Sequence, residues 1–96
     1  MGELAARVAL VTGAGRGIGR AAALALTRDG ARVVGVSRSA DELARLHEEC
    51  GAATVVASLD DAAGCRAAVS AARELGPIQI LVNNAGIGSA HDAAAW

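Results

Sequence analysis

A cluster of glycines is the feature of this sequence whose residue types and spacing could do chemistry. Four glycines fall within seven residues of the run Thr12-Gly-Ala-Gly-Arg-Gly-Ile-Gly19. Glycine permits positive φ and lets backbone N–H groups approach a ligand closely, so such a run suits a turn that holds a phosphate group. A tight turn without a ligand is the alternative, but it would need only one or two glycines. A Walker A loop is excluded, because no Gly-Lys-Ser/Thr follows and all nine basic residues are arginine.

The residues around the cluster predict a strand before it and a helix after it. Residues 7–12 form a nearly continuous apolar run, which is typical of a strand buried on both faces of a parallel sheet. Residues 18–29 are rich in helix formers, and Gly30 follows where a C-terminal cap belongs. The expected apolar face of this helix consists of Ile18, Ala22, Ala25 and Leu26. The glycines would therefore lie at the N-terminal end of a helix, where the helix dipole favours an anion.

The same alternation of strand and helix continues along the chain. Strands are predicted at residues 32–37, 54–59 and 78–83, and a helix at residues 40–50. A third helix is predicted after residues 60–61, and Gly76-Pro77 ends it. Ser39 and Glu42 have the spacing of a capping box, and Asp60 or Asp61 would cap the third helix. The expected buried face of that helix consists of Cys65, Val69, Ala72 and Leu75. The pattern predicts an α/β fold, the N-terminal part of a Rossmann-like, doubly wound parallel sheet with strand order 3-2-1-4.

Two motifs together give the chain a family resemblance. The glycine cluster fits Thr-Gly-x-x-x-Gly-x-Gly, and Asn83-Asn84-Ala85-Gly86 follows the last predicted strand. With these motifs the chain resembles the short-chain dehydrogenase/reductase family from residue 7 to about residue 88. The resemblance implies that the cofactor pyrophosphate lies on Gly13, Arg16, Gly17, Ile18 and Gly19. It also implies that Asn83, Ala85 and Gly86 line the adenosine ribose, although Asn83 could equally be structural and bond backbone across the crevice.

The residues that follow the second predicted strand favour NADP as the cofactor. Dinucleotide folds that select NAD usually carry Asp or Glu about 20 residues after the glycine turn, to accept the ribose 2′-hydroxyl. Ser37 and Arg38 occupy that place here. Arg38 can bind a 2′-phosphate, Ser37 leaves room for it, and Arg16 can reach it from the turn. We therefore expect NADP rather than NAD, and the alternative is that both arginines are simply solvated surface residues.

The adenine contact departs from the family pattern. Members usually carry Asp where the third strand ends, whereas the best register puts Ser58 there with Leu59 beside it. Ser58 can accept a hydrogen bond, but it lacks the charge of a carboxylate. Alternatively the loop shifts and Asp60, two residues later, takes that role.

The resemblance covers only the N-terminal part of the family domain. The family's catalytic Tyr, Lys and Ser lie in the remaining part, and this sequence has no tyrosine and no lysine, so no catalytic residue is assigned. We expect residues 1–96 to be the dinucleotide-binding segment of an incomplete domain. The complete protein would transfer hydride between NADP(H) and a small carbonyl or alcohol substrate, and we expect it to be a homo-oligomer. The alternatives are a stand-alone nucleotide-binding module and, less favoured, a methyltransferase.

Composition excludes several other classes of function. The 96 residues carry a formal net charge of −1 with a single aromatic residue, which argues against nucleic-acid binding. The longest apolar run, residues 21–26, is too short to span a membrane, so we expect a cytoplasmic protein. Two histidines and two cysteines have no metal-binding spacing, and we expect Cys50 and Cys65 to be reduced and part-buried. Alanine fills 25 positions, which predicts a thin core, and the last strand would be an exposed apolar edge.

Overall fold

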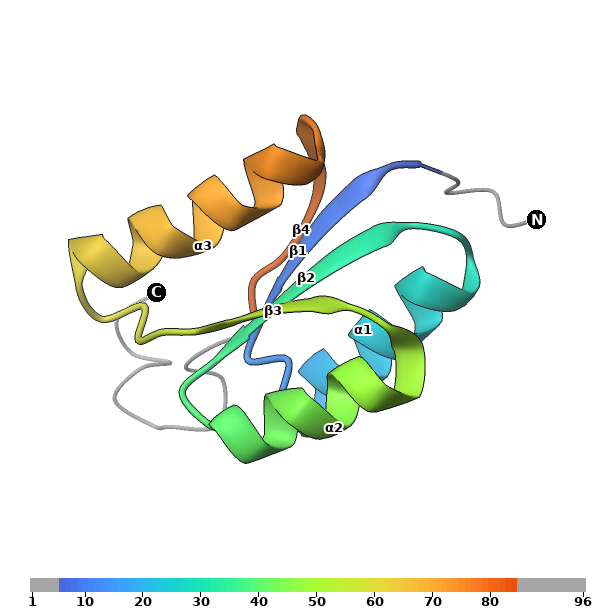
Figure 1. Cartoon of the computed structure of the whole chain (residues 1–96), viewed down its shortest axis with the longest axis horizontal. Coiled ribbons are helices and arrows are strands. Elements are labelled where there is room, and N and C mark those ends of the chain that lie inside the picture. The colour runs from blue at the N-terminus through green and yellow to red at the C-terminus, as the bar shows by residue number, and fades with distance from the viewer. Residues whose placement is uncertain (1–5, 85–96) are drawn as a thin grey trace.

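A computed structural model describes residues 6–84, which form one parallel four-stranded sheet between two layers of helices (Figure 1). In chain order the elements are β1 (Val8–Thr12), α1 (Gly17–Arg28), β2 (Arg32–Ser37), α2 (Ala40–Cys50), β3 (Ala53–Val56), α3 (Ala62–Leu75) and β4 (Ile78–Val82). The strand order is β3-β2-β1-β4 and every pairing is parallel, which confirms the predicted fold class and strand order. Helices α1 and α2 cover one face of the sheet and α3 covers the other.

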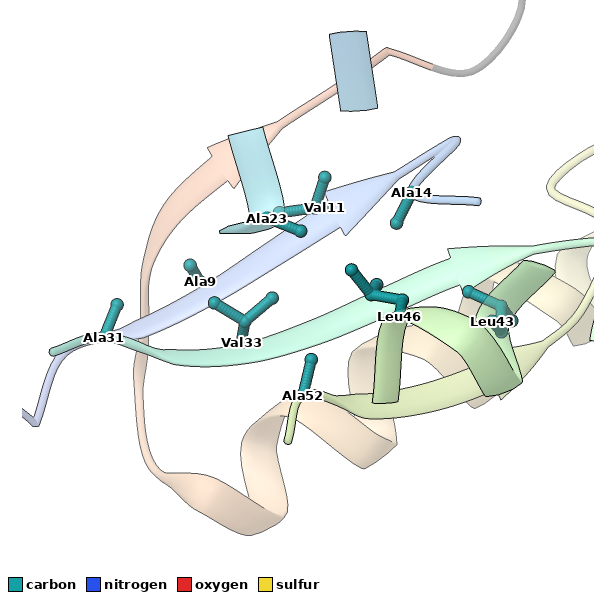
Figure 2. Close-up of a cluster of buried hydrophobic side chains, with 9 residues drawn as sticks. All are labelled: Ala9, Val11, Ala14, Ala23, Ala31, Val33, Leu43, Leu46 and Ala52. Carbon is teal, nitrogen blue, oxygen red and sulfur yellow. The ribbon is translucent and has the colours of Figure 1, made fainter. Parts of the chain in front are cut away.

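Strand β1 lies at the centre of the sheet and is buried at all five positions, as its continuous apolar sequence predicted. Its alternate side chains enter two separate core clusters, because successive residues of a strand point to opposite faces. The cluster under α1 and α2 consists of Ala9, Val11, Ala14, Ala23, Ala31, Val33, Leu43, Leu46 and Ala52 (Figure 2). The cluster under α3 consists of Val8, Leu10, Val34, Val36, Ala68 and Ala72. Alanine supplies five of the nine residues of the first cluster and two of the six of the second, in keeping with the thin core expected from the composition.

The predicted faces of α1 and α3 are only partly buried. In α1 the buried residues are Gly19 and Ala23. Of the predicted face, Leu26 packs half-buried against the cluster, whereas Ile18 is 72% exposed and Ala25 is also exposed. In α3 the buried residues are Ala68 and the predicted Ala72, and the predicted Leu75 packs half-buried against the same cluster. The predicted Cys65 and Val69 are exposed. In both helices small residues take the fully buried positions, and small side chains let a helix approach the sheet closely. In α2 the buried residues are Leu43 and Leu46.

The caps of α2 and α3 were mostly predicted correctly. Ser39 Oγ accepts a hydrogen bond from the Glu42 N–H (3.3 Å), and Asp61 Oδ1 accepts one from the Gly64 N–H (2.6 Å). The capping box is incomplete, because the Ser39 N–H donates to Ser37 Oγ (3.1 Å) instead of to Glu42. Of the two candidate caps for α3, Asp61 is therefore the one used.

Strand β3 ends earlier than predicted, at Val56 instead of residue 59. Ser58 and Leu59 consequently lie in the loop between β3 and α3. At the other edge, β4 has β1 as its one strand partner within residues 6–84, and its Leu81 is 63% exposed. The exposed apolar edge expected for the last strand is thus confirmed for the described part of the chain.

The cysteine prediction is half correct. Both thiols are free, and Cys50 is half-buried, but Cys65 is exposed. Residues 6–84 contain no group of three or more His, Cys, Asp or Glu side chains that could hold a metal ion. No helix in the same range is long and apolar enough to cross a membrane.

Candidate functional site

The turn between β1 and α1 uses two of its glycines for their backbone conformation. Gly13 has φ +62° and Gly17 has φ +61°, a region that residues with a Cβ rarely adopt. Gly17 is also the first residue of α1, and a Cβ built on it would meet no described atom within 4 Å besides those of its chain neighbours and of its own helix backbone. The backbone of Gly17 therefore borders open space at the N-terminus of the helix.

Gly19 is required because α1 lies against the turn that precedes it. A Cβ on Gly19 would overlap the carbonyl oxygen of Gly13 and would lie 2.7 Å from its carbonyl carbon and 2.8 Å from Asn84 Nδ2. No side chain can occupy that position unless the helix moves. The first helical turn is thus fixed directly above the end of β1.

The N-terminus of α1 differs chemically from those of α2 and α3. Its N-cap is Arg16, whose side chain makes no capping hydrogen bond within the described part of the chain, and its first turn contains no acidic residue. The peptide N–H groups at a helix start that lacks such a cap carry a partial positive charge. Together with the exposed Arg16, this end of the helix can bind an anion.

Gly15 has a different reason to be glycine, and sequence reasoning missed it. It is not among the positive-φ residues, and it occupies a position that the family pattern leaves free. A Cβ on Gly15 would lie 2.6 Å from Glu42 Oε1 and 3.0 Å from Ser37 Oγ. The side chains of Glu42 and Ser37 therefore occupy the space that Gly15 leaves. The extra glycine in the cluster was the one available signal that another element packs there.

The end of β2 is held beside this turn. The Ala14 N–H donates to the Val36 carbonyl (3.1 Å), and Ser37 Oγ accepts from the Ser39 N–H. Ser37 is half-buried and Arg38, which follows it, is exposed. The one ion pair within residues 6–84 joins Arg20 of α1 to Glu49 of α2, so neither Arg16 nor Arg38 is in an ion pair there. Both guanidinium groups are available to a ligand.

Thr12 joins the end of β1 to the end of β4. Its Oγ1 accepts a hydrogen bond from the Asn84 N–H (2.9 Å) and lies within hydrogen-bond distance of the Val82 carbonyl (3.3 Å) and Asn83 Oδ1 (3.2 Å). Asn83 thus has a structural contact across the strand ends, made to a side chain and not to backbone as the structural alternative proposed. Asn83 is exposed despite its contact with Thr12.

The loop after β3 begins at this same edge of the sheet. Ser58 Oγ accepts from the Asp60 N–H (3.2 Å), so the predicted adenine-contact residue is engaged within its own loop. A Cβ on Gly64 would overlap the Ser58 carbonyl oxygen, so the first turn of α3 lies tightly against this loop. An isolated glycine inside a predicted helix was the available signal for that close approach.

Most of the predicted site residues lie at the carboxyl ends of the parallel strands. The turn after β1 and the start of α1 carry Gly13, Arg16, Gly17, Ile18 and Gly19. Ser37 and Arg38 lie at the end of β2, Ser58 and Leu59 in the loop after β3, and Asn83 after β4. Ala85 and Gly86 lie outside the described residues. The ligand crevice of an open parallel sheet is at this edge. The arrangement can bind an anion, and the chain has neither the tyrosine nor the lysine needed for proton transfer by the predicted route.

Comparison with known proteins agrees with the fold and the motifs. The family model described as short chain dehydrogenase matches residues 7–95. The chain is 51% identical over 82 residues to a D-erythrulose reductase of Gallus gallus and 45% identical over 80 residues to carbonyl reductase [NADPH] 2 of Sus scrofa. These matches cover 84% and 82% of this chain but 32% of each relative, so the chain spans about a third of their length.

A solved structure shows the same arrangement of elements. The 3-ketoacyl-(acyl-carrier-protein) reductase of Brucella melitensis, solved in complex with NADH, has a TM-score of 0.84 to this chain and is 43% identical to it. The match covers 90% of this chain and 36% of that protein.

Proposed function

Since this chain belongs to the short-chain dehydrogenase family, we propose that it is the NADP(H)-binding part of an oxidoreductase that transfers hydride between NADP(H) and a carbonyl or alcohol substrate. The observation that carries the proposal is the open space at Gly17. Gly17 has positive φ, it is the first residue of α1, and the space where its Cβ would stand is open. Such a cradle suits a pyrophosphate, whose charge would meet the N-terminal end of the helix dipole.

The turn residues would hold the pyrophosphate in distinct ways. The pyrophosphate would approach the backbone of Gly13 and Gly17, which a Cβ at either position would block. Gly19 would keep the helix close to the turn. Arg16 would supply positive charge, and Ile18, which is exposed, would supply an apolar contact beside it. When bound, the nicotinamide would accept or supply hydride, while these residues bind and orient the dinucleotide.

The preference for NADP rests on residues at the end of β2. Arg38 is exposed and outside any ion pair within residues 6–84, and the half-buried Ser37 beside it is small. A 2′-phosphate could be bound there by charge-assisted hydrogen bonds from Arg38 and Arg16. One relative is named for NADPH, and one structural neighbour was solved with NADH.

The remaining site residues would contact the adenosine. We propose that Ser58 and Leu59 lie against the adenine, with Asp60 as the alternative acceptor. Asn83, Ala85 and Gly86 would line the ribose. Although β3 ends at Val56, Ser58 lies in the loop that directly follows the carboxyl end of that strand, where the adenine would bind.

We further propose that residues 1–96 are one incomplete dinucleotide-binding domain of a cytoplasmic homo-oligomer. The catalytic Tyr, Lys and Ser would then lie in a segment that corresponds to the part of the relatives outside the match. The substrate would be a small carbonyl or alcohol compound, by analogy with relatives named as reductases.

A titration of the protein with NADPH and with NADH tests the proposal, with nucleotide fluorescence as the readout. Gly17→Ala should reduce affinity for both nucleotides by at least about tenfold, because the added Cβ would occupy the pyrophosphate cradle. Gly51→Ala is the matched control, since Gly51 also has positive φ (+77°) and open space where its Cβ would be. It lies at the C-terminal end of α2, away from the proposed site. Absence of nucleotide binding to the unmodified protein, or equal affinities in the two variants, would refute the proposed site.

A further inference from the structure

The carboxylate of Glu42 lies at the candidate site, and the proposed function gives it no role. Glu42 is a half-buried residue of the first turn of α2. Glu42 Oε1 and Ser37 Oγ both border the position that a Cβ of Gly15 would take, at 2.6 and 3.0 Å from it. The carboxylate therefore fills the space between the β1–α1 turn and the end of β2.

This position puts a negative charge beside the residues that precede the two arginines of the proposed 2′ site. Gly15 is followed by Arg16 and Ser37 by Arg38, so each group beside the carboxylate adjoins a basic residue in sequence. Glu42 is not part of the one ion pair within residues 6–84, which joins Arg20 to Glu49. Its charge is therefore not neutralised by a paired arginine and acts on whatever occupies the space beside Ser37.

We propose that Glu42 is a specificity-determining residue that limits the discrimination between NADP(H) and NAD(H), an inference that rests on the proposed function. A carboxylate at the end of β2 accepts a hydrogen bond from a ribose 2′-hydroxyl and repels a 2′-phosphate. Glu42 approaches the same place from α2. It offsets part of the attraction of Arg16 and Arg38 for the phosphate and offers an acceptor to the hydroxyl. The protein then binds both nucleotides, with a smaller preference for NADP(H) than two unopposed arginines would give.

A purely structural role is the competing explanation for Glu42. An acidic residue in the first turn of a helix stabilises the helix through its dipole. Asp41 occupies the same turn, has the same charge and is exposed, but no described contact joins it to Gly15 or Ser37. Asp41 is therefore a control that matches Glu42 in helix position and charge and differs in its place relative to the site.

The test is a fluorescence titration of NADPH and NADH against the unmodified protein, Glu42→Gln and Asp41→Asn, with thermal unfolding of each. Glu42→Gln keeps the size of the side chain and removes its charge. We expect it to raise affinity for NADPH by about 3- to 10-fold and to leave NADH affinity equal or lower. Asp41→Asn should leave the ratio of the two affinities within about twofold of the unmodified protein, since its charge lies outside the site.

The outcomes separate this inference from the proposed function. If the unmodified protein binds neither nucleotide, the proposed function fails and the inference fails with it. If the nucleotides bind but Glu42→Gln shifts the affinity ratio no more than Asp41→Asn does, the inference alone is overturned and Glu42 has a structural role. Glu42→Asp gives a second measurement, because it keeps the charge on a shorter side chain and should leave the ratio nearer to that of the unmodified protein than Glu42→Gln does.

Discussion

The backbone N–H of Asn84 donates a hydrogen bond to the hydroxyl of Thr12, and the two atoms are 2.9 Å apart although the residues are 72 positions apart in sequence. The hydroxyl also lies 3.2 Å from Asn83 Oδ1. Backbone pairing between β1 and β4 extends as far as Val11 and Val82. The side chain of Thr12 therefore continues the connection between the two segments beyond the last backbone pair and keeps the two motifs adjacent.

Thr12→Val should destabilise the protein because it removes the acceptor for the Asn84 N–H without changing the shape of the side chain. We expect the free energy of unfolding to fall by about 1–2 kcal/mol, the usual cost of leaving such a donor without a partner. Urea unfolding measures this quantity. Thr27→Val is the control, since the Thr27 hydroxyl donates to a helix carbonyl, that of Ala23 (2.8 Å). An equal or smaller loss for Thr12→Val would mean that the link between β1 and β4 does not depend on this hydroxyl.

Gly19→Ala should be more damaging than its single methyl group suggests. The new Cβ would overlap the Gly13 carbonyl, so either α1 or the turn must move. Overpacking of this kind costs about 1–3 kcal/mol. Thermal unfolding should show a clear decrease in stability, and dinucleotide affinity should fall at the same time because Gly13 belongs to the proposed cradle.

The comparison for Gly19→Ala is Ala22→Gly, which makes the opposite change in the same helix. It removes a methyl group from a half-buried position and should cost roughly 0.5–1 kcal/mol through helix propensity, with nucleotide binding retained. If Gly19→Ala lost stability but bound nucleotide normally, the close packing of α1 on the turn would be separate from the binding site.

The fold was predictable because its strongest signals are local. The continuous apolar run of β1, the glycines that follow it and the Leu43 and Leu46 pair in α2 each depend on a few neighbouring residues. The faces of α1 and α3 were not predictable in the same way. Alanine is abundant on every side of these helices, so hydrophobic periodicity could not distinguish the face with Ile18 from the face with Gly19 and Ala23.

The candidate site was predictable where a motif sets the backbone and not where side chains meet across the fold. The turn glycines were identified from their spacing, and their φ values explain Gly13 and Gly17. The approach of Glu42 to Gly15 depends on how α2 packs, which the spacing between residues 15 and 42 does not encode. The early end of β3 had the same origin, because Ala57 and Leu59 are apolar but pack against the α3-side cluster from a loop.

Asp61→Ala should destabilise the protein and Asp60→Ala should not. Asp61 Oδ1 accepts the Gly64 N–H at the start of α3, and loss of such a cap costs about 0.5–2 kcal/mol. Asp60 is exposed, and its backbone N–H, not its carboxylate, makes the contact with Ser58. Urea unfolding of both variants checks the difference. The same two proteins, titrated with NADPH, also test the adenine contact, because only a role for Asp60 would make Asp60→Ala weaken binding while stability is unchanged.

Arg38→Gln should weaken NADPH binding much more than NADH binding. A 2′-phosphate would lose a charge-assisted hydrogen bond, which is worth about 1.5–3 kcal/mol, and we expect a decrease in NADPH affinity of about 10-fold once the exposure of Arg38 is allowed for. NADH has no 2′-phosphate, so its affinity should change by less than about threefold. Fluorescence titration of both nucleotides gives the two affinities, and Arg45→Gln is the control because Arg45 is an exposed arginine in the middle of α2, away from the strand ends.

Ionic strength gives an independent measurement of the same contact. Added salt should reduce NADPH affinity more steeply for the unmodified protein than for Arg38→Gln, because screening acts on the charge that the variant has lost. Equal losses of NADPH and NADH affinity in Arg38→Gln would show that the guanidinium supports the fold or the shared part of the nucleotide. In that case the selection of NADP would have to come from Arg16, and Arg16→Gln would show the difference between the two nucleotides instead.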